Sequence, residues 1–134
     1  MAGISFPIQE EIVKVLTLHL AGQIRGGKNN MIVLRNGMHI PKKTWAEWRD
    51  IAVSQLRAQR CGFFFEKPCK IEVLYWCADL RRRDVPGLAD SLCHCLEHAG
   101  IVKDDSLLTD WTWSFRGLDR DKPRAAITIT EDKP

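Results

Sequence analysis

The chain has 134 residues, of which 45% are hydrophobic and 28% are charged, and its formal net charge is +3 at pH 7. These values are typical of a soluble globular protein that is long enough for one core and too short for two. No export signal and no apolar run of membrane-spanning length is found, so a secreted or membrane-inserted protein is not expected. We expect one domain over residues 1–134, with residues 1–11 as an extended or disordered tail.

The charge is unevenly distributed along the chain. Residues 1–78 carry 11 Lys and Arg against 6 Asp and Glu, which gives +5, whereas residues 79–134 carry 9 against 11, which gives −2. A basic first part and an acidic second part are compatible with phosphate contacts from one region and metal ligands from the other. An uneven solvated surface explains the same numbers equally well.

The first part of the chain is expected to be β-structure. Residues 12–20 are rich in β-branched and apolar side chains, which predicts a strand. Two further apolar segments, 31–35 and 38–40, flank the dipeptide Asn36-Gly37. This dipeptide tolerates the positive φ angles of a tight type I′ turn, so we expect a β-hairpin.

A helix is predicted to begin near Thr44 and to end near Cys61-Gly62. Thr44 and Glu47 have the spacing of a capping box, in which each side chain accepts from a free backbone amide. The apolar residues of this segment recur at helical spacing, so its two tryptophans are expected to be core anchors rather than base-stacking platforms. The residues with this spacing are Trp45, Trp48, Ala52, Leu56 and Gln59.

The second part of the chain is expected to alternate strands with one more helix. Residues 69–77 form a clear strand pattern, a helix opens at Pro86 and closes at Gly100, and two more strands follow near 110–116 and 124–130. The fold class expected is therefore α/β, with a mixed sheet of about five strands, a hairpin and two main helices. The predicted buried stripe of the second helix is Leu88, Leu92, Cys95, Leu96 and Ala99.

The cysteines argue for a reducing compartment. Their number is odd and none forms a Cys-x-x-Cys pair, so neither a disulfide framework nor a zinc site is expected. We interpret them as mostly small buried hydrophobes in a cytoplasmic protein. They are Cys61, Cys69, Cys77, Cys93 and Cys95.

Charged residues cluster on both sides of the second helix. Three arginines stand beside Asp84 where the strand 69–77 ends, and Asp104 and Asp105 follow the helix on a turn. Hard cations such as Mg²⁺ prefer carboxylate oxygens and phosphates prefer arginine, so the arrangement suits a metal site held against nucleic acid. A strand end paired with Asp79 and a solvated turn would explain the same residues without such a site. The arginines are Arg81, Arg82 and Arg83.

The order of these motifs resembles the RusA family of Holliday-junction endodeoxyribonucleases, which occur in phages and prophages. The resemblance is carried by Arg82-Arg83-Asp84-Val85-Pro86-Gly87-Leu88, by a helix ending in His98-Ala99-Gly100-Ile101-Val102, and by Lys103-Asp104-Asp105-Ser106. It extends over most of the chain from about residue 15, but only the block 82–106 is specific.

The resemblance implies a small α/β protein that forms a homodimer, binds four-way DNA junctions and makes paired nicks with carboxylate-held Mg²⁺. By position, Asp84 matches the first acidic ligand and Asp105 the distal one, with Asp104 in support. We expect these carboxylates to converge on one cation. Residues expected to grip DNA are Arg81, Arg82, Arg83, Lys28, Asn29 and Asn30.

Two positions depart from the family pattern. Pro86 stands where the family has a second aspartate, and Asp90 stands where it has a functional lysine. Asp90 could supply the lost carboxylate from the helix, as a catalytic and metal-binding residue. His94 lies one turn further on, and its participation would favour Mn²⁺ over Mg²⁺ because imidazole suits transition metals.

Three functions are compatible with this sequence. The first is a metal-dependent endonuclease that resolves four-way junctions in recombination and repair, in the cytoplasm of a bacterial or phage-infected cell, with no small-molecule cofactor. The second is a weakened or inactive relative that binds branched DNA without cutting it. The third is an interaction protein that retains the fold and does not bind DNA.

Overall fold

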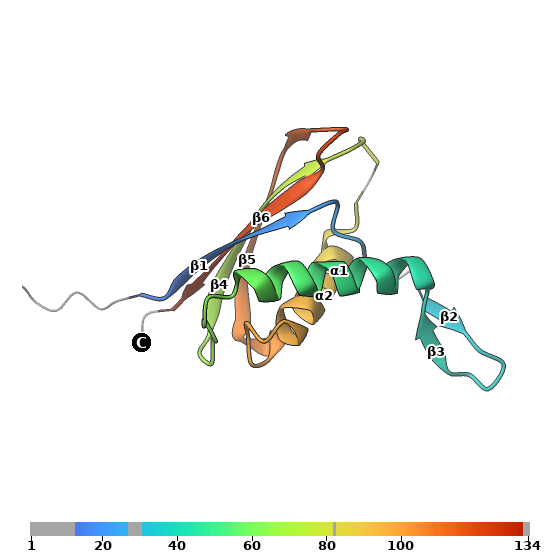
Figure 1. Ribbon diagram of the computed structural model, residues 1–134, viewed down its shortest axis with the longest axis horizontal. Coiled ribbons are helices and arrows are strands. Elements are labelled where there is room, and N and C mark those ends of the chain that lie inside the picture. The colour runs from blue at the N-terminus through green and yellow to red at the C-terminus, as the bar shows by residue number, and fades with distance from the viewer. Residues whose placement is uncertain (1–12, 27–30, 82, 133–134) are drawn as a thin grey trace, which may run out of the picture.

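Two helices cover one face of a four-stranded mixed sheet, and a separate two-stranded hairpin stands apart from it (Figure 1). The computed structural model describes residues 13–26, 31–81 and 83–132. The predicted α/β class is confirmed, but the main sheet has four strands rather than about five, because the hairpin does not join it. The predicted N-terminal tail, 1–11, lies outside the described residues.

The main sheet contains β1 (Val15–Ala21), β4 (Cys69–Cys77), β5 (Leu108–Leu118) and β6 (Arg124–Glu131) in the order β1-β6-β4-β5. β6 pairs antiparallel with β1 and β4, whereas β4 and β5 are parallel. A parallel pair requires a crossover connection, which is supplied by α2 (Val85–His98). The helix must therefore return the chain to the end of the sheet where β4 begins.

The hairpin consists of β2 (Met31–Val33) and β3 (His39–Pro41). Its turn differs from the predicted type I′ turn because Gly37 has a φ of +84° but Asn36 does not have a positive φ. The N–H of Gly37 donates to the carbonyl oxygen of Leu34 at 2.9 Å. A four-residue turn whose last residue is a left-handed glycine is typical of a three-residue hairpin loop, which needs only one positive φ.

The first helix, α1 (Lys43–Gln59), begins one residue before the predicted cap. Lys42 occupies the N-cap and no side chain caps the helix, so the predicted capping box at Thr44 is wrong. Thr44 is already in the first turn, where its hydroxyl cannot take the N-cap position. Glu47 instead pairs with Lys43 one turn before it, at 3.9 Å.

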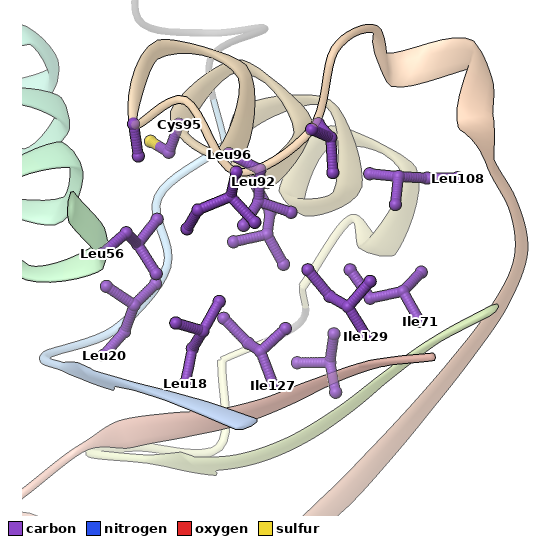
Figure 2. Close-up of a cluster of buried hydrophobic side chains, with 14 of the residues drawn as sticks. Leu18, Leu20, Leu56, Ile71, Leu92, Cys95, Leu96, Leu108, Ile127 and Ile129 are labelled. Carbon is purple, nitrogen blue, oxygen red and sulfur yellow. The ribbon is translucent and has the colours of Figure 1, made fainter. Parts of the chain in front are cut away.

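Buried side chains of both helices and of the sheet form one core cluster (Figure 2). Leu18, Ile71 and Ile127 point up from the sheet into this core. The predicted core position of Trp45 is confirmed, since only 7% of it is exposed. The whole predicted stripe of α2 is also buried, namely Leu88, Leu92, Cys95, Leu96 and Ala99.

The cysteines are all free, and three of the five are buried, as predicted for small hydrophobes. Cys93 is half-buried and Cys61 is exposed. In the part of the chain that the structure describes, no helix has the length and apolar character needed to cross a membrane.

Candidate functional site

Three carboxylates converge where α2 ends. One oxygen from each of Glu97, Asp104 and Asp105 lies within 4.8 Å of the other two. Glu97 is on the last turn of α2, and Asp105 opens the short 3₁₀ helix η1 (Asp105–Leu107). The chain can turn back between them because Gly100 adopts a φ of +74°.

Hydrogen bonds hold these carboxylates in place. The Asp104 side chain accepts from the N–H of Ser106 at 2.9 Å and so caps η1. The Glu97 side chain accepts from the backbone N–H of Asp105. The turn is further anchored by Val102, which is buried and forms a β-bridge with Phe65. The three carboxylates are therefore fixed by the backbone rather than placed on a free loop.

The two aspartates titrate as a pair. The hydrogen bond from the N–H of Ser106, followed by one from Asp105, lowers the pKa of Asp104. The hydrogen bond with Asp104, followed by the negative charge of Glu97, raises the pKa of Asp105. Carboxylates this close repel each other unless a proton or a cation lies between them. The cluster therefore has the donor type and the negative charge that a hard divalent cation requires.

Asp84 lies at the other end of α2, where it occupies the N-cap without a side-chain cap hydrogen bond. It lines a groove of about 780 Å³ together with Arg25, Arg81 and Arg83. Asp79 lies in the same groove, which is therefore mixed in charge, with three described arginines and two aspartates.

The arginines of this groove have different roles. Arg83 donates to Asp79 at 2.9 Å and to the side-chain oxygen of Gln23 at 2.8 Å, and only 18% of its side chain is exposed. It therefore stabilises the segment after β4. This agrees with the alternative explanation of the arginines as a strand end paired with Asp79. Arg81 is 3.8 Å from Asp79, but its side chain is 86% exposed, and Arg25 is also exposed, so these two arginines of the groove remain accessible to a phosphate.

The structure does not bring Asp84 and Asp105 together within one chain. α2 has 14 residues, and a helix of that length spans about 20 Å. Because β4 and β5 are parallel, the exit of β4 and the turn before β5 lie at opposite ends of the sheet. The expectation that these two carboxylates of one chain converge on one cation is therefore wrong.

Asp90 is exposed on α2 and precedes Glu97 by seven residues, or about 10 Å along the helix. Burial, followed by the charges of Asp105, Asp90 and Glu97, raises the pKa of Cys93 to about 12. Asp90 therefore faces the same side of α2 as the three carboxylates. Among the described residues, however, neither Asp90 nor Asp84 belongs to a group of three donor atoms close enough to share a cation.

His94 faces α1 rather than the carboxylates. Its ring packs against Trp45, with ring centres 5.6 Å apart, and against His98 at 4.1 Å. Its Nε2 atom is buried and has no hydrogen-bond partner among the described residues. Burial, followed by the proximity of His98 and Arg49, lowers the pKa of His94. These contacts place His94 between the helices, so its expected entry into the metal site is not supported.

The remaining predicted DNA contacts, Lys28, Asn29, Asn30 and Arg82, lie outside the described residues. Glu97 is the site residue that the sequence interpretation missed. The sequence did contain a sign of its role. Glu97 lies on the polar face of α2, one turn before Gly100, where the chain turns towards Asp104.

No protein-family model matches the chain, and a comparison with curated proteins finds no significant match. The likeness to the RusA family therefore rests on the residues and their order alone.

Proposed function

We propose that the chain is a metal-dependent endonuclease that cuts branched DNA, such as four-way junctions, and that it holds its cation with Glu97, Asp104 and Asp105. The observation that carries the proposal is the convergence of these carboxylates within 4.8 Å at the end of the block that resembles RusA. A RusA-like fold, a homodimer and a role in recombination and repair belong to the same proposal.

The donor set fits Mg²⁺. All three ligands would be carboxylate oxygens, which hard divalent cations prefer, and two of them are exposed, which leaves room for water and phosphate. Mn²⁺ accepts the same oxygen ligands. When bound, such a cation lowers the pKa of a water ligand and stabilises negative charge on a phosphate. Glu97 and Asp104 orient the site through their backbone hydrogen bonds.

Phosphate binding and metal binding would occupy opposite ends of α2. Arg81 and Arg25 line the groove at the N-terminal end, about 20 Å from the carboxylates. Each nucleotide of a DNA strand advances about 3.4 Å along the helix axis, so this separation corresponds to roughly six nucleotides along a duplex. The proposal therefore requires DNA to lie along α2 rather than to contact one end of it.

The test is incubation of the protein with a synthetic four-way junction in Mg²⁺ or Mn²⁺. Wild-type protein should give paired nicks, and Asp105→Asn or Glu97→Gln should abolish them while junction binding persists. Asp110→Asn is the matched control, since Asp110 is an exposed aspartate that pairs with Lys70 at 3.9 Å. Junction binding with no cleavage in either metal would reject the nuclease.

A second candidate, a protein that binds branched DNA without cutting it, is favoured by one observation. Asp84, the position that matches the family's first ligand, is separated from the carboxylates by the length of α2. In addition, the RusA family has a metal-binding aspartate at the position of Pro86 and a functional lysine at the position of Asp90, and this chain has neither. The same assay distinguishes these candidates, and absence of any DNA binding at low salt would leave an interaction protein.

A further inference from the structure

We propose that the β2–β3 hairpin is the element that enters the branch point of the DNA, with Leu34 and Met38 as an apolar wedge between unstacked bases. This inference rests on the proposed function, because it names the part of the branched DNA that the hairpin contacts. Apolar side chains such as Leu and Met are used in this way by proteins that kink and partly unstack DNA.

The hairpin projects from the rest of the molecule. Figure 1 shows β2 and β3 beyond the N-terminal end of α1, on the side away from the main sheet. At its tip, 39% of Leu34 and 56% of Met38 are exposed. Neither side chain belongs to the core cluster or packs against it. Two apolar residues are therefore presented to solvent on a two-stranded ribbon, which has a width that a DNA groove can admit.

The tip is held in a defined shape. The N–H of Leu34 donates to the carbonyl oxygen of Met38 at 2.8 Å, and the N–H of Met38 donates to the Asn36 side chain at 2.9 Å. Leu34 and Met38 thus lie opposite each other across the hairpin. Side chains at opposed positions emerge on the same face of a β-ribbon, so the two form one apolar unit.

The surroundings of this apolar pair are basic. From Arg25 to Lys43 the sequence has five Lys and Arg and no Asp or Glu. Within the described part of the chain, no ion pair involves Arg25, Arg35 or Lys42. An apolar tip flanked by unneutralised cations complements a polyanion that also offers stacked bases.

The base of the hairpin adjoins the arginine groove. The indole N–H of Trp45 donates to the carbonyl oxygen of Arg25 at 3.3 Å, which fixes the segment that leads into the hairpin. Gly26 lies against the first turn of α2, where a Cβ added to it would be 3.7 Å from the carbonyl carbon of Gly87. Arg25 and Arg81 line the same groove. Phosphates held in this groove would lie beside the base of the hairpin when its tip occupies the branch point.

The experiment places 2-aminopurine at the branch point of a four-way junction, with Ca²⁺ in place of Mg²⁺ so that no cleavage occurs. Wild-type protein should raise the fluorescence as the base unstacks. The double variant Leu34→Ser/Met38→Ser should abolish this rise and weaken junction binding about tenfold, while duplex affinity changes by less than about twofold. Ile51→Ser is the matched control, because Ile51 is 58% exposed on α1.

Three other results of this experiment would each lead to a different conclusion. If wild-type protein prefers the junction and the double variant behaves as wild type does, the hairpin inference is wrong and the proposed function stands. If wild-type protein does not prefer the junction to duplex, the proposed function fails and the inference fails with it. If the double substitution instead changes the oligomeric state in sedimentation experiments, the tip contacts a second copy of the chain, and the DNA assignment is rejected.

Discussion

The carboxylate of Glu97 accepts a hydrogen bond from the backbone N–H of Asp105, and this contact joins the last turn of α2 to the turn that follows it. It places a third acidic side chain beside Asp104 and Asp105. The last turn of α2 carries one basic residue, His98, whereas the negative charge of the site comes from these three carboxylates.

Glu97→Gln should keep the hydrogen bond to Asp105 but remove one charge from the site. We expect Mn²⁺ affinity to fall by at least about tenfold, since even ligand-supporting groups contribute about 10–100-fold to metal affinity. Thermal stability should change little, because the amide oxygen of Gln can still accept from the Asp105 N–H. Isothermal titration with Mn²⁺ and thermal denaturation measure the two effects. Loss of stability with unchanged Mn²⁺ affinity would assign Glu97 a purely structural role.

Metal affinity should depend on pH through Asp105. Its pKa is raised by the hydrogen bond with Asp104 and by Glu97, so it takes up a proton earlier on acidification than an ordinary aspartate does. A proton and a cation compete for the same oxygens. Mn²⁺ affinity should therefore fall as the pH is lowered from about 7 towards about 4. Glu97→Gln should move this fall to lower pH, because the charge of Glu97 helps to raise the pKa of Asp105. A pH-independent affinity in the wild-type chain would contradict binding at this pair.

Local patterns predicted much of this fold from the sequence. The periodicity of Leu88, Leu92 and Leu96 identified the buried face of α2, and Gly100 identified its end. The separation in space between Asp84 and Asp105 was not predictable in the same way. It depends on β4 and β5 being parallel, which is a property of strand pairing and not of either segment alone.

Gly100→Ala should destabilise the chain and disturb the carboxylate cluster. An L-residue at a φ of +74° costs about 1–2 kcal/mol, and the added Cβ would lie 3.2 Å from the guanidinium of Arg60. Chemical denaturation measures the loss. Gly62→Ala is the matched control, since Gly62 has a φ of +79° with no atom within 4 Å of the added Cβ. A reduced Mn²⁺ affinity in Gly100→Ala alone would show that this turn positions the ligands.

The environment of His94 predicts that the chain loses stability on mild acidification. Burial and the neighbouring His98 and Arg49 lower the pKa of His94 in the folded state, so the unfolded state binds the proton more readily. Stability should therefore fall as the pH drops below about 6.5 towards the lower folded-state pKa, and should level off below it. Urea denaturation at about pH 7.5 and pH 5.5 should show a smaller difference for His94→Gln than for wild type. The exposed His19 provides the control His19→Gln, which should leave the difference unchanged.

Asp84→Asn distinguishes the carboxylate cluster from a site that would also need Asp84. Asp84 is about 20 Å from Asp105 along α2, so within one chain it cannot reach a cation bound there. We expect Asp84→Asn to leave Mn²⁺ affinity unchanged within about twofold, whereas Asp105→Asn abolishes tight binding. Isothermal titration of the two variants under identical conditions makes the comparison. Equal losses in both variants would contradict a site built within one chain, and would require Asp84 of a second copy to approach the carboxylates.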